Sequence, residues 1–196
     1  MGGLLHLTRR FVGSLRPGPP AAEDEAWARS LLMPREQAVW QRMSNPDRRH
    51  AVAVARAVAE RWPAGTGGAR GPDSDPGGDT GSGADGGPDR PVLAAALLHD
   101  SGKVLSGLRT PARVVATVVW AVLGDETADR WLDAPDRSRR ARLARYRRHP
   151  ELGADVLRHA GSDPLTSSWA AEHHRPEDRW TVPVEIGRVL KACDDD

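Results

Sequence analysis

The sequence contains a single cysteine, Cys193, among its 196 residues. One cysteine excludes an internal disulfide framework and is consistent with a reducing, cytoplasmic setting. The net charge is only +1, so composition alone favours neither nucleic acid nor an acidic partner. Apart from the segment PVLAAALLHDSGK, the longest apolar run is residues 114–123. This run is about half as long as a membrane span and predicts a core helix instead.

Two segments lack the apolar content of a folded core. Residues 1–21 hold two small apolar clusters, three arginines and a Pro/Gly break, which predicts a flexible leader; a weakly amphipathic surface helix is the alternative. Residues 64–90 are dominated by Gly, Asp and Pro and contain no aliphatic side chain larger than alanine. Such a segment cannot offset its ordering entropy, so we expect a disordered insertion between two helices of one domain, residues 22–196.

Strand signals are also missing, because no segment alternates apolar and polar residues convincingly. Prolines instead stand where helical patterns begin, and several follow a capping residue, as in Asn45-Pro46, Thr110-Pro111 and Asp163-Pro164. Gly161 is expected to end a helix. The prolines in question are Pro34, Pro46, Pro91, Pro111, Pro150, Pro164 and Pro183. The sequence therefore predicts a single all-α domain.

What is present is a set of ionisable residues on apolar helix faces. His50 is four residues from Val54, His173 is four from Trp169, and Asp194 is four from Leu190, so each pair shares a face. The apolar segment PVLAAALLHDSGK runs directly into His99 and Asp100. A buried imidazole or carboxylate is costly unless it is paired or bound to a metal. Four helices that point such groups inward predict a shared metal centre, since both groups are natural ligands of divalent transition metals.

Two further positions extend this centre to two ions. His149 precedes Pro150 at a helix start, and His174 follows His173 directly. Neighbouring helical residues diverge by about 100°, so a His-His or His-Asp pair can serve two ions, with Asp100 bridging them. His6 in the leader is expected to be incidental, and His159 is expected to be a helix C-terminal cap.

The ordered set of His50, His99-Asp100, His149, His173-His174 and Asp194 resembles the HD-domain superfamily of metal-dependent phosphohydrolases. LLHDSGK is similar to the HD-x-G-K signature of that superfamily, while HPELGADVL and EHH are similar to additional motifs of its binuclear members. The resemblance covers residues 36–195 apart from the insertion. It implies that His50, His99, Asp100 and Asp194 hold one metal ion. A second ion would be held by the bridging Asp100 with His149, His173 and His174.

The resemblance also implies a reaction and the residues that contact its substrate. Asp100 and Lys103 would be the catalytic residues in the hydrolysis of a nucleotide or another small phosphoester, with Lys103 on the phosphate. Arg175 and Trp180 are further candidates for substrate binding, Trp180 by stacking on a base. Glu172 is expected either to support the metal ligands or, more simply, to form surface salt bridges. The HD-GYP type of this superfamily has a Gly-Tyr-Pro element after its His-His pair, and this chain has RPEDRW instead, which argues against cyclic-dinucleotide cleavage.

Two alternatives use the same helical domain differently. A regulatory HD module would bind a ligand or partner without turnover, and a di-iron oxygenase would use the same ligands for oxygen chemistry. The arginine-rich segment 137–150 allows either recruitment of an anionic substrate or a solvated helix face with Leu143 and Tyr146 turned inward. Nucleic-acid binding by this segment is not expected, because interleaved stacking aromatics are missing.

Overall fold

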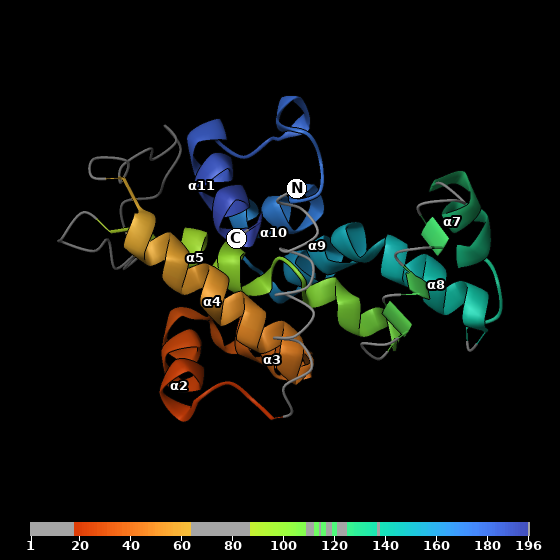
Figure 1. The fold of residues 1–196 in the computed structure, drawn as a ribbon, viewed down its shortest axis with the longest axis horizontal. Coiled ribbons are helices and arrows are strands. Elements are labelled where there is room, and N and C mark those ends of the chain that lie inside the picture. The colour runs from red at the N-terminus through yellow and green to blue at the C-terminus, as the bar shows by residue number, and fades with distance from the viewer. Residues whose placement is uncertain are drawn as a thin grey trace, which may run out of the picture.

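The computed structural model describes residues 18–63, 87–108, 112–113, 115–116, 119–120, 125–136 and 138–195. Within these ranges the chain forms α-helices and short 3-10 helices without a strand, which confirms the predicted all-α class (Figure 1). None of the described helices has the length and apolar character needed to cross a membrane. The elements in chain order are α2 (Ala22–Leu31), α3 (Pro34–Arg42), α4 (Asn45–Arg61), α5 (Arg90–Leu98), η1 (Ser101–Ser106), α7 (Asp125–Leu132), α8 (Arg139–Arg147), α9 (His149–Ala160), α10 (Pro164–Glu172), η2 (Glu177–Arg179) and α11 (Val184–Asp195).

The predicted leader and insertion fall mostly outside the described residues. Of the leader, only residues 18–21 are described, and of the insertion only residues 87–90. Arg90 is already the first residue of α5, so this helix takes the last position of the predicted insertion. The predicted core helix at residues 114–123 is described at only four positions, where Ala116 and Trp120 are buried but Val115 is 60% exposed.

The helices begin and end at the predicted capping and terminating residues, except that the predicted cap of α4 is wrong by one residue. Asp163 caps α10 by accepting a hydrogen bond from the helix backbone at 2.8 Å, and Gly161 ends α9 with φ of +76°. Both were predicted. The predicted cap Asn45 is instead the first residue of α4, and Ser44 is the cap, accepting from the backbone N–H of Asp47 at 3.4 Å. The Thr110-Pro111 cap lies outside the described residues.

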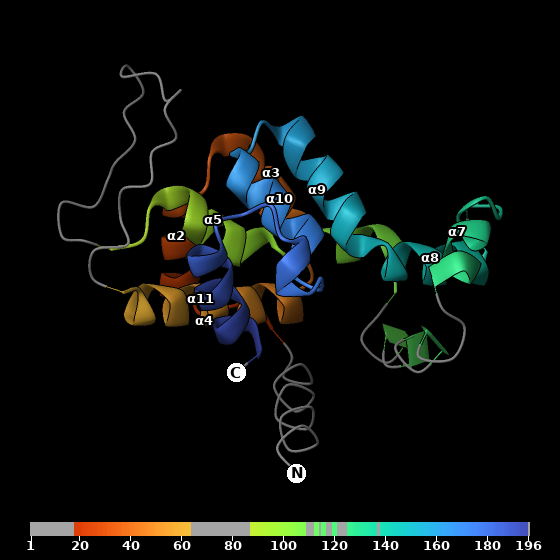
Figure 2. The ribbon, with the colours of Figure 1, turned by 90° about the horizontal axis from the view of Figure 1, so that it is seen from above.

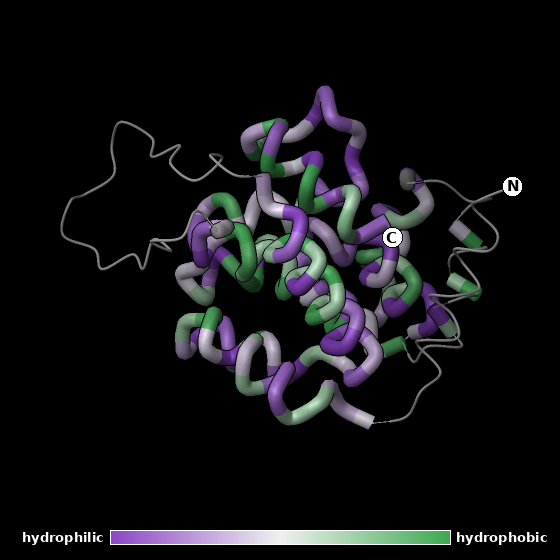
Figure 3. Tube along the Cα trace, turned by 60° about the vertical axis from the view of Figure 1, so that its left-hand side comes forward, coloured by the Kyte–Doolittle hydropathy of each residue, from purple (hydrophilic) through white to green (hydrophobic). Residues whose placement is uncertain are grey.

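Two apolar clusters hold the helices together. The larger one lies among α2–α5 and α9–α11 and contains the fully buried side chains of Trp40, Leu97, Leu157, Trp169 and Leu190. In Figure 3 polar and apolar residues alternate along these helices, as expected of amphipathic helices around a shared core. A smaller cluster lies with α7 and α8 at one end of the molecule, to the right in Figure 2.

The smaller cluster shows where the apolar residues of the arginine-rich segment lie. Leu143 and Tyr146 of α8 pack against the buried side chains of Ala116, Trp120 and Ala128. The indole N–H of Trp120 also donates to the backbone carbonyl of Leu143 at 3.1 Å. Helix α8 therefore turns its apolar residues inward and leaves most of its arginines on the outer face, as the simpler interpretation predicted.

A close approach of η1 and α9 sets the position of the ionisable residues. A Cβ atom on Gly102 would lie 2.0 Å from the backbone oxygen of His149 and 2.6 Å from the backbone nitrogen of Gly153. A Cβ atom on Gly153 would lie 2.9 Å from the backbone nitrogen of Gly102. Only glycine at both positions permits this contact, and the contact places Asp100, just before η1, against His149 at the start of α9.

Candidate metal centre

Three buried histidines share one orientation, which their backbone contacts impose. The Nδ1 atoms of His99, His149 and His173 lie 2.9, 2.7 and 2.9 Å from the backbone carbonyl oxygen three residues earlier in the chain. A carbonyl oxygen can only accept, so each Nδ1 carries the proton and donates it. Each ring therefore presents its Nε2 atom to the interior, which is the orientation expected of metal-ligating imidazole.

These three Nε2 atoms converge on the carboxylate of Asp100. The Nε2 of His149 lies 3.4 Å and that of His173 lies 3.6 Å from Asp100 Oδ1, while His99 Nε2 lies 3.5 Å from Asp100 Oδ2. The three Nε2 atoms and Asp100 Oδ1 are all buried without a hydrogen-bond partner. So many unsatisfied polar atoms at one point would be costly. A metal ion would satisfy them, because neutral imidazole and carboxylate are donors that divalent transition metals accept.

The first of two ligand groups consists of His50, His99 and Asp194. Their ligand atoms all lie within 4.8 Å of one another. His50 Nε2 is 2.9 Å and His99 Nε2 is 3.5 Å from Asp194 Oδ1. These residues come from α4, the end of α5 and the last turn of α11, so the group joins three helices far apart in the sequence.

The second group consists of His149, His173 and His174, and it is open to solvent on one side. Their ligand atoms also lie within 4.8 Å of one another, with His149 and His173 buried and His174 exposed. The rings of His173 and His174 are 4.0 Å apart, and those of His149 and His174 are 5.3 Å apart. Asp100 lies between the groups, with Oδ2 toward His99 and Oδ1 toward His149 and His173. The described residues thus bring six of the seven predicted ligands together in two groups that could hold metal ions, with the seventh, Asp100, between them.

The two groups differ in charge when no metal is bound. Burial alone would lower the pKa of His99, but the carboxylates of Asp100 and Asp194 outweigh burial and raise this pKa to about 10. Burial lowers the pKa of His173 to about 4. Although part of His174 is exposed, its ring loses water where it lies beside the rings of His173 and His149, and this desolvation lowers the pKa of His174. At neutral pH the first group therefore carries a proton that a metal would have to displace, whereas His173 and His174 are already neutral.

Both carboxylates of the centre remain ionised despite their burial. Burial would raise the pKa of Asp100, but the charges of Lys103 and His99 hold it well below its usual range. Burial likewise opposes ionisation of Asp194, and the charge of His99 with the contact to His50 lowers its pKa strongly. An ionised Asp100 between the groups is the form that could bridge two cations.

Lys103 lies against the Asp100 oxygen that also faces His99. Its Nζ forms an ion pair with Asp100 Oδ2, and its side chain is 19% exposed. Burial would lower the pKa of Lys103, but Asp100 raises it, so the amine is charged. A fixed positive charge next to the centre can neutralise an anionic substrate oxygen, which is the role the resemblance implies.

The structure corrects the expected position of Glu172. This residue is buried rather than on the surface, and its carboxylate accepts hydrogen bonds from the following loop. Thr181 donates its backbone N–H at 2.7 Å and its hydroxyl at 2.6 Å, and the N–H of Val182 lies at 3.4 Å. Glu172 therefore fixes the loop after the His173-His174 pair.

Trp180 lies in the same loop, and much of its ring surface is taken up by packing. Its ring packs edge to face against Trp169, with the ring centroids 5.4 Å apart. The ring also covers Gly187, where a Cβ atom would lie 2.6 Å from a ring carbon of Trp180. Its indole N–H donates to the backbone oxygen of Arg175 at 3.0 Å. Base stacking by Trp180, as the sequence suggested, thus has to compete with this packing.

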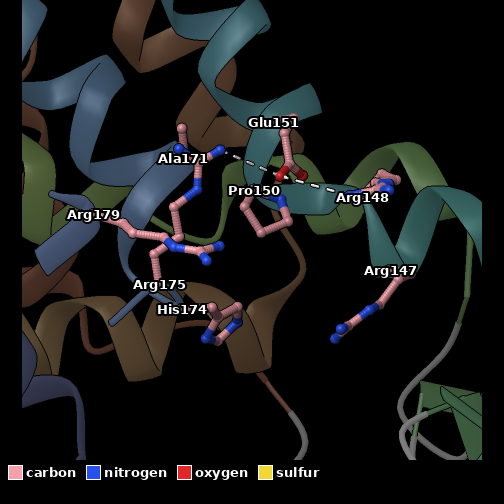
Figure 4. A pocket seen from close by; sticks show the side chains of 8 residues that line it. All are labelled: Arg147, Arg148, Pro150, Glu151, Ala171, His174, Arg175 and Arg179. Atoms are coloured by element: carbon pink, nitrogen blue, oxygen red, sulfur yellow. Dashed lines mark ion pairs between the residues drawn. The ribbon is translucent and has the colours of Figure 1, made fainter. Parts of the chain in front are cut away.

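A basic pocket of about 380 Å³ adjoins the second ligand group (Figure 4). It includes His174 and the predicted substrate residue Arg175, and two arginines of the arginine-rich segment. The residues that line it are Arg147, Arg148, Pro150, Glu151, Ala171, His174, Arg175 and Arg179. Sequence analysis missed Glu151 and Arg179, although their proximity to the predicted ligands His149 and His174 was a usable signal.

Of the two remaining histidines, His159 is described and does not join the centre. His159 is exposed in the last turn of α9, where its Nδ1 lies 2.7 Å from the carbonyl oxygen of Asp155, in the terminal position predicted for it. His6 lies outside the described residues. No family model, curated protein or solved structure matches the chain.

Proposed function

We propose that the chain is a metal-dependent phosphohydrolase of the HD type that cleaves a phosphomonoester or phosphodiester of a nucleotide or related small molecule. The observation that carries this proposal is the convergence of three unpartnered, buried Nε2 atoms on the two oxygens of Asp100. Two divalent ions, bound by the groups on either side of Asp100, would stabilise charge on the phosphoryl oxygens and lower the pKa of a water. The candidate ions are manganese, iron, cobalt, nickel, zinc and magnesium, and the ligands present do not distinguish among them.

The chain's own residues would bind and orient the phosphoester. Lys103 holds a positive charge against Asp100 and can neutralise a non-bridging phosphate oxygen. The exposed side of His174 leaves an approach to the second ligand group, and the arginines around that approach attract anions. The single buried cysteine and the absence of a spanning helix among the described residues are compatible with a cytoplasmic location, which forms part of the proposal.

Hydrolysis assays with a matched control test the proposal. Protein loaded with manganese or iron should release p-nitrophenol from p-nitrophenyl phosphate or its bis-ester, or phosphate from a nucleotide panel. Asp100→Asn removes the bridging negative charge and should lower activity at least about 100-fold. Asp155→Asn, an exposed carboxylate on α9, should leave activity unchanged. A protein that binds metal but turns over none of these esters would contradict the proposal and favour a regulatory binding module. Oxygen consumption with bound iron would contradict it in favour of an oxygenase.

A further inference from the structure

The pocket beside His174 carries more positive than negative charge. Among the described residues that line it, four are arginines and one, Glu151, is acidic. Arginine stays protonated at any physiological pH, so these charges do not depend on conditions. Figure 4 shows Arg175 and Arg179 together on one side of the pocket and Arg147 on the other, with His174 at its edge. A guanidinium cluster of this kind suits the planar, paired recognition of phosphate oxygens.

Two carboxylates neutralise only part of the cluster: Asp129 pairs with Arg148 at 2.6 Å, and Glu151 lies near both Arg148 and Arg175. The Oε1 of Glu151 lies 3.6 Å from a nitrogen of Arg175 and 4.0 Å from a nitrogen of Arg148. Both distances exceed the roughly 2.7–2.9 Å of a close charge-assisted hydrogen bond. One carboxylate thus lies between two guanidinium groups without a close bond to either, and an anionic ligand could compete for Arg175.

The loop that carries Arg175 and Arg179 is fixed at both ends. Glu172 accepts hydrogen bonds from Thr181, and the indole of Trp180 donates to the backbone oxygen of Arg175. The 3-10 helix η2 ends at Arg179, between these two attachments. A ligand would therefore meet two arginines whose backbone is already ordered, which reduces the entropy cost of binding.

His174 belongs both to this pocket and to the second ligand group. Building on the proposed function, we infer that the pocket binds a second phosphate group of the substrate. The preferred substrate is then a small molecule with at least two phosphates, one at the metal centre and one between Arg175 and Arg179. The pocket volume of about 380 Å³ fits this class, since small-molecule sites span roughly 300–1,000 Å³.

Binding of inorganic pyrophosphate to the metal-free protein tests the inference directly. Calorimetry in the presence of EDTA removes any contribution from the metal centre and needs no turnover. The native chain should bind pyrophosphate more tightly than it binds inorganic phosphate. The double variant Arg175→Gln/Arg179→Gln should weaken pyrophosphate binding at least about tenfold, because it removes the charged hydrogen bonds from two guanidinium groups to the phosphate oxygens. Arg158→Gln removes one exposed arginine from α9 outside the pocket and should leave the affinity unchanged.

Two further variants separate charge from folding. Glu151→Gln removes the carboxylate that lines the pocket and should tighten pyrophosphate binding about three- to tenfold, a gain that misfolding cannot produce. Arg175→Lys should restore only part of the affinity, since lysine cannot bind bidentately. Equal affinity in the native chain and the double variant, or weaker binding in Glu151→Gln, would overturn the inference. Tighter binding of a single-stranded oligonucleotide than of pyrophosphate, lost in the same double variant, would overturn it in favour of a nucleic-acid site.

The second-phosphate site and the proposed hydrolase can be refuted separately. If the metal-free chain does not bind pyrophosphate but the manganese-loaded chain hydrolyses p-nitrophenyl phosphate, the second-phosphate site is wrong and the hydrolase stands. If pyrophosphate binds as expected and no ester is turned over, the pocket stands as an anion site and the hydrolase is wrong.

Discussion

Replacing Gly102 with alanine tests how the fold positions the centre. The new Cβ atom would lie 2.0 Å from the carbonyl oxygen of His149 and 2.6 and 2.9 Å from two backbone atoms of Gly153. All three neighbours are backbone, so no side chain can move aside. Restoring an ordinary contact of 3.4 Å requires η1 and α9 to separate by about 1.4 Å.

That separation would act on both stability and metal binding. Overpacking of this kind costs about 1–3 kcal/mol of unfolding free energy. The separation would also move the Nε2 of His149 away from Asp100 Oδ1, now 3.4 Å distant. Metal ligands tolerate displacements of only about 0.2 Å, so the second ligand group should lose its ion while the first retains it.

The assay combines thermal unfolding with metal content of the purified variant. Gly102→Ala should unfold at a lower temperature than the native chain and retain about one metal ion instead of two. Gly87→Ala is the matched control, because a Cβ atom there meets nothing within 4 Å. A Gly102→Ala protein with native stability and native metal content would refute the claim that this glycine contact positions His149 against Asp100.

Three further results are expected. Glu172→Gln should lower the free energy of unfolding by about 1–3 kcal/mol in urea denaturation, because its carboxylate accepts the hydrogen bonds of Thr181; native stability would contradict this role. Lys103→Gln should lower kcat about 100-fold with unchanged metal content, whereas loss of metal would make Lys103 a structural residue. The pKa of His99 is raised to about 10 without metal, so its proton must leave when metal binds. Metal affinity should therefore rise with pH below that value, and calorimetry in two buffers should detect proton release at neutral pH; no release would contradict it.

The fold class and the grouping of the candidate ligands could be predicted because both depend on local signals. Prolines at helix starts and apolar residues at helical spacing are readable from sequence. They predict the faces on which His173 and Asp194 are buried and His50 is half-buried. The cap of α4 was missed by one residue, because both Ser44 and Asn45 are good capping residues and only the backbone geometry selects between them.

What could not be predicted depends on contacts between distant residues. Nothing in the sequence around Glu172 shows that its carboxylate meets Thr181, so a surface position was the simpler expectation for a charged side chain. The facing pair Gly102 and Gly153 depends on the crossing of η1 and α9. The pocket likewise combines arginines from the end of α8 with arginines from the loop before α11, which only the fold brings together.

Metal content per chain, measured by elemental analysis of protein purified without chelator or added metal, tests the central claim most directly. We expect about two transition-metal ions per native chain. Asp100→Asn should retain clearly fewer, since both ligand groups lose their shared carboxylate. A native chain without metal that takes up none when manganese or iron is added would contradict the binuclear centre and the proposed hydrolase with it.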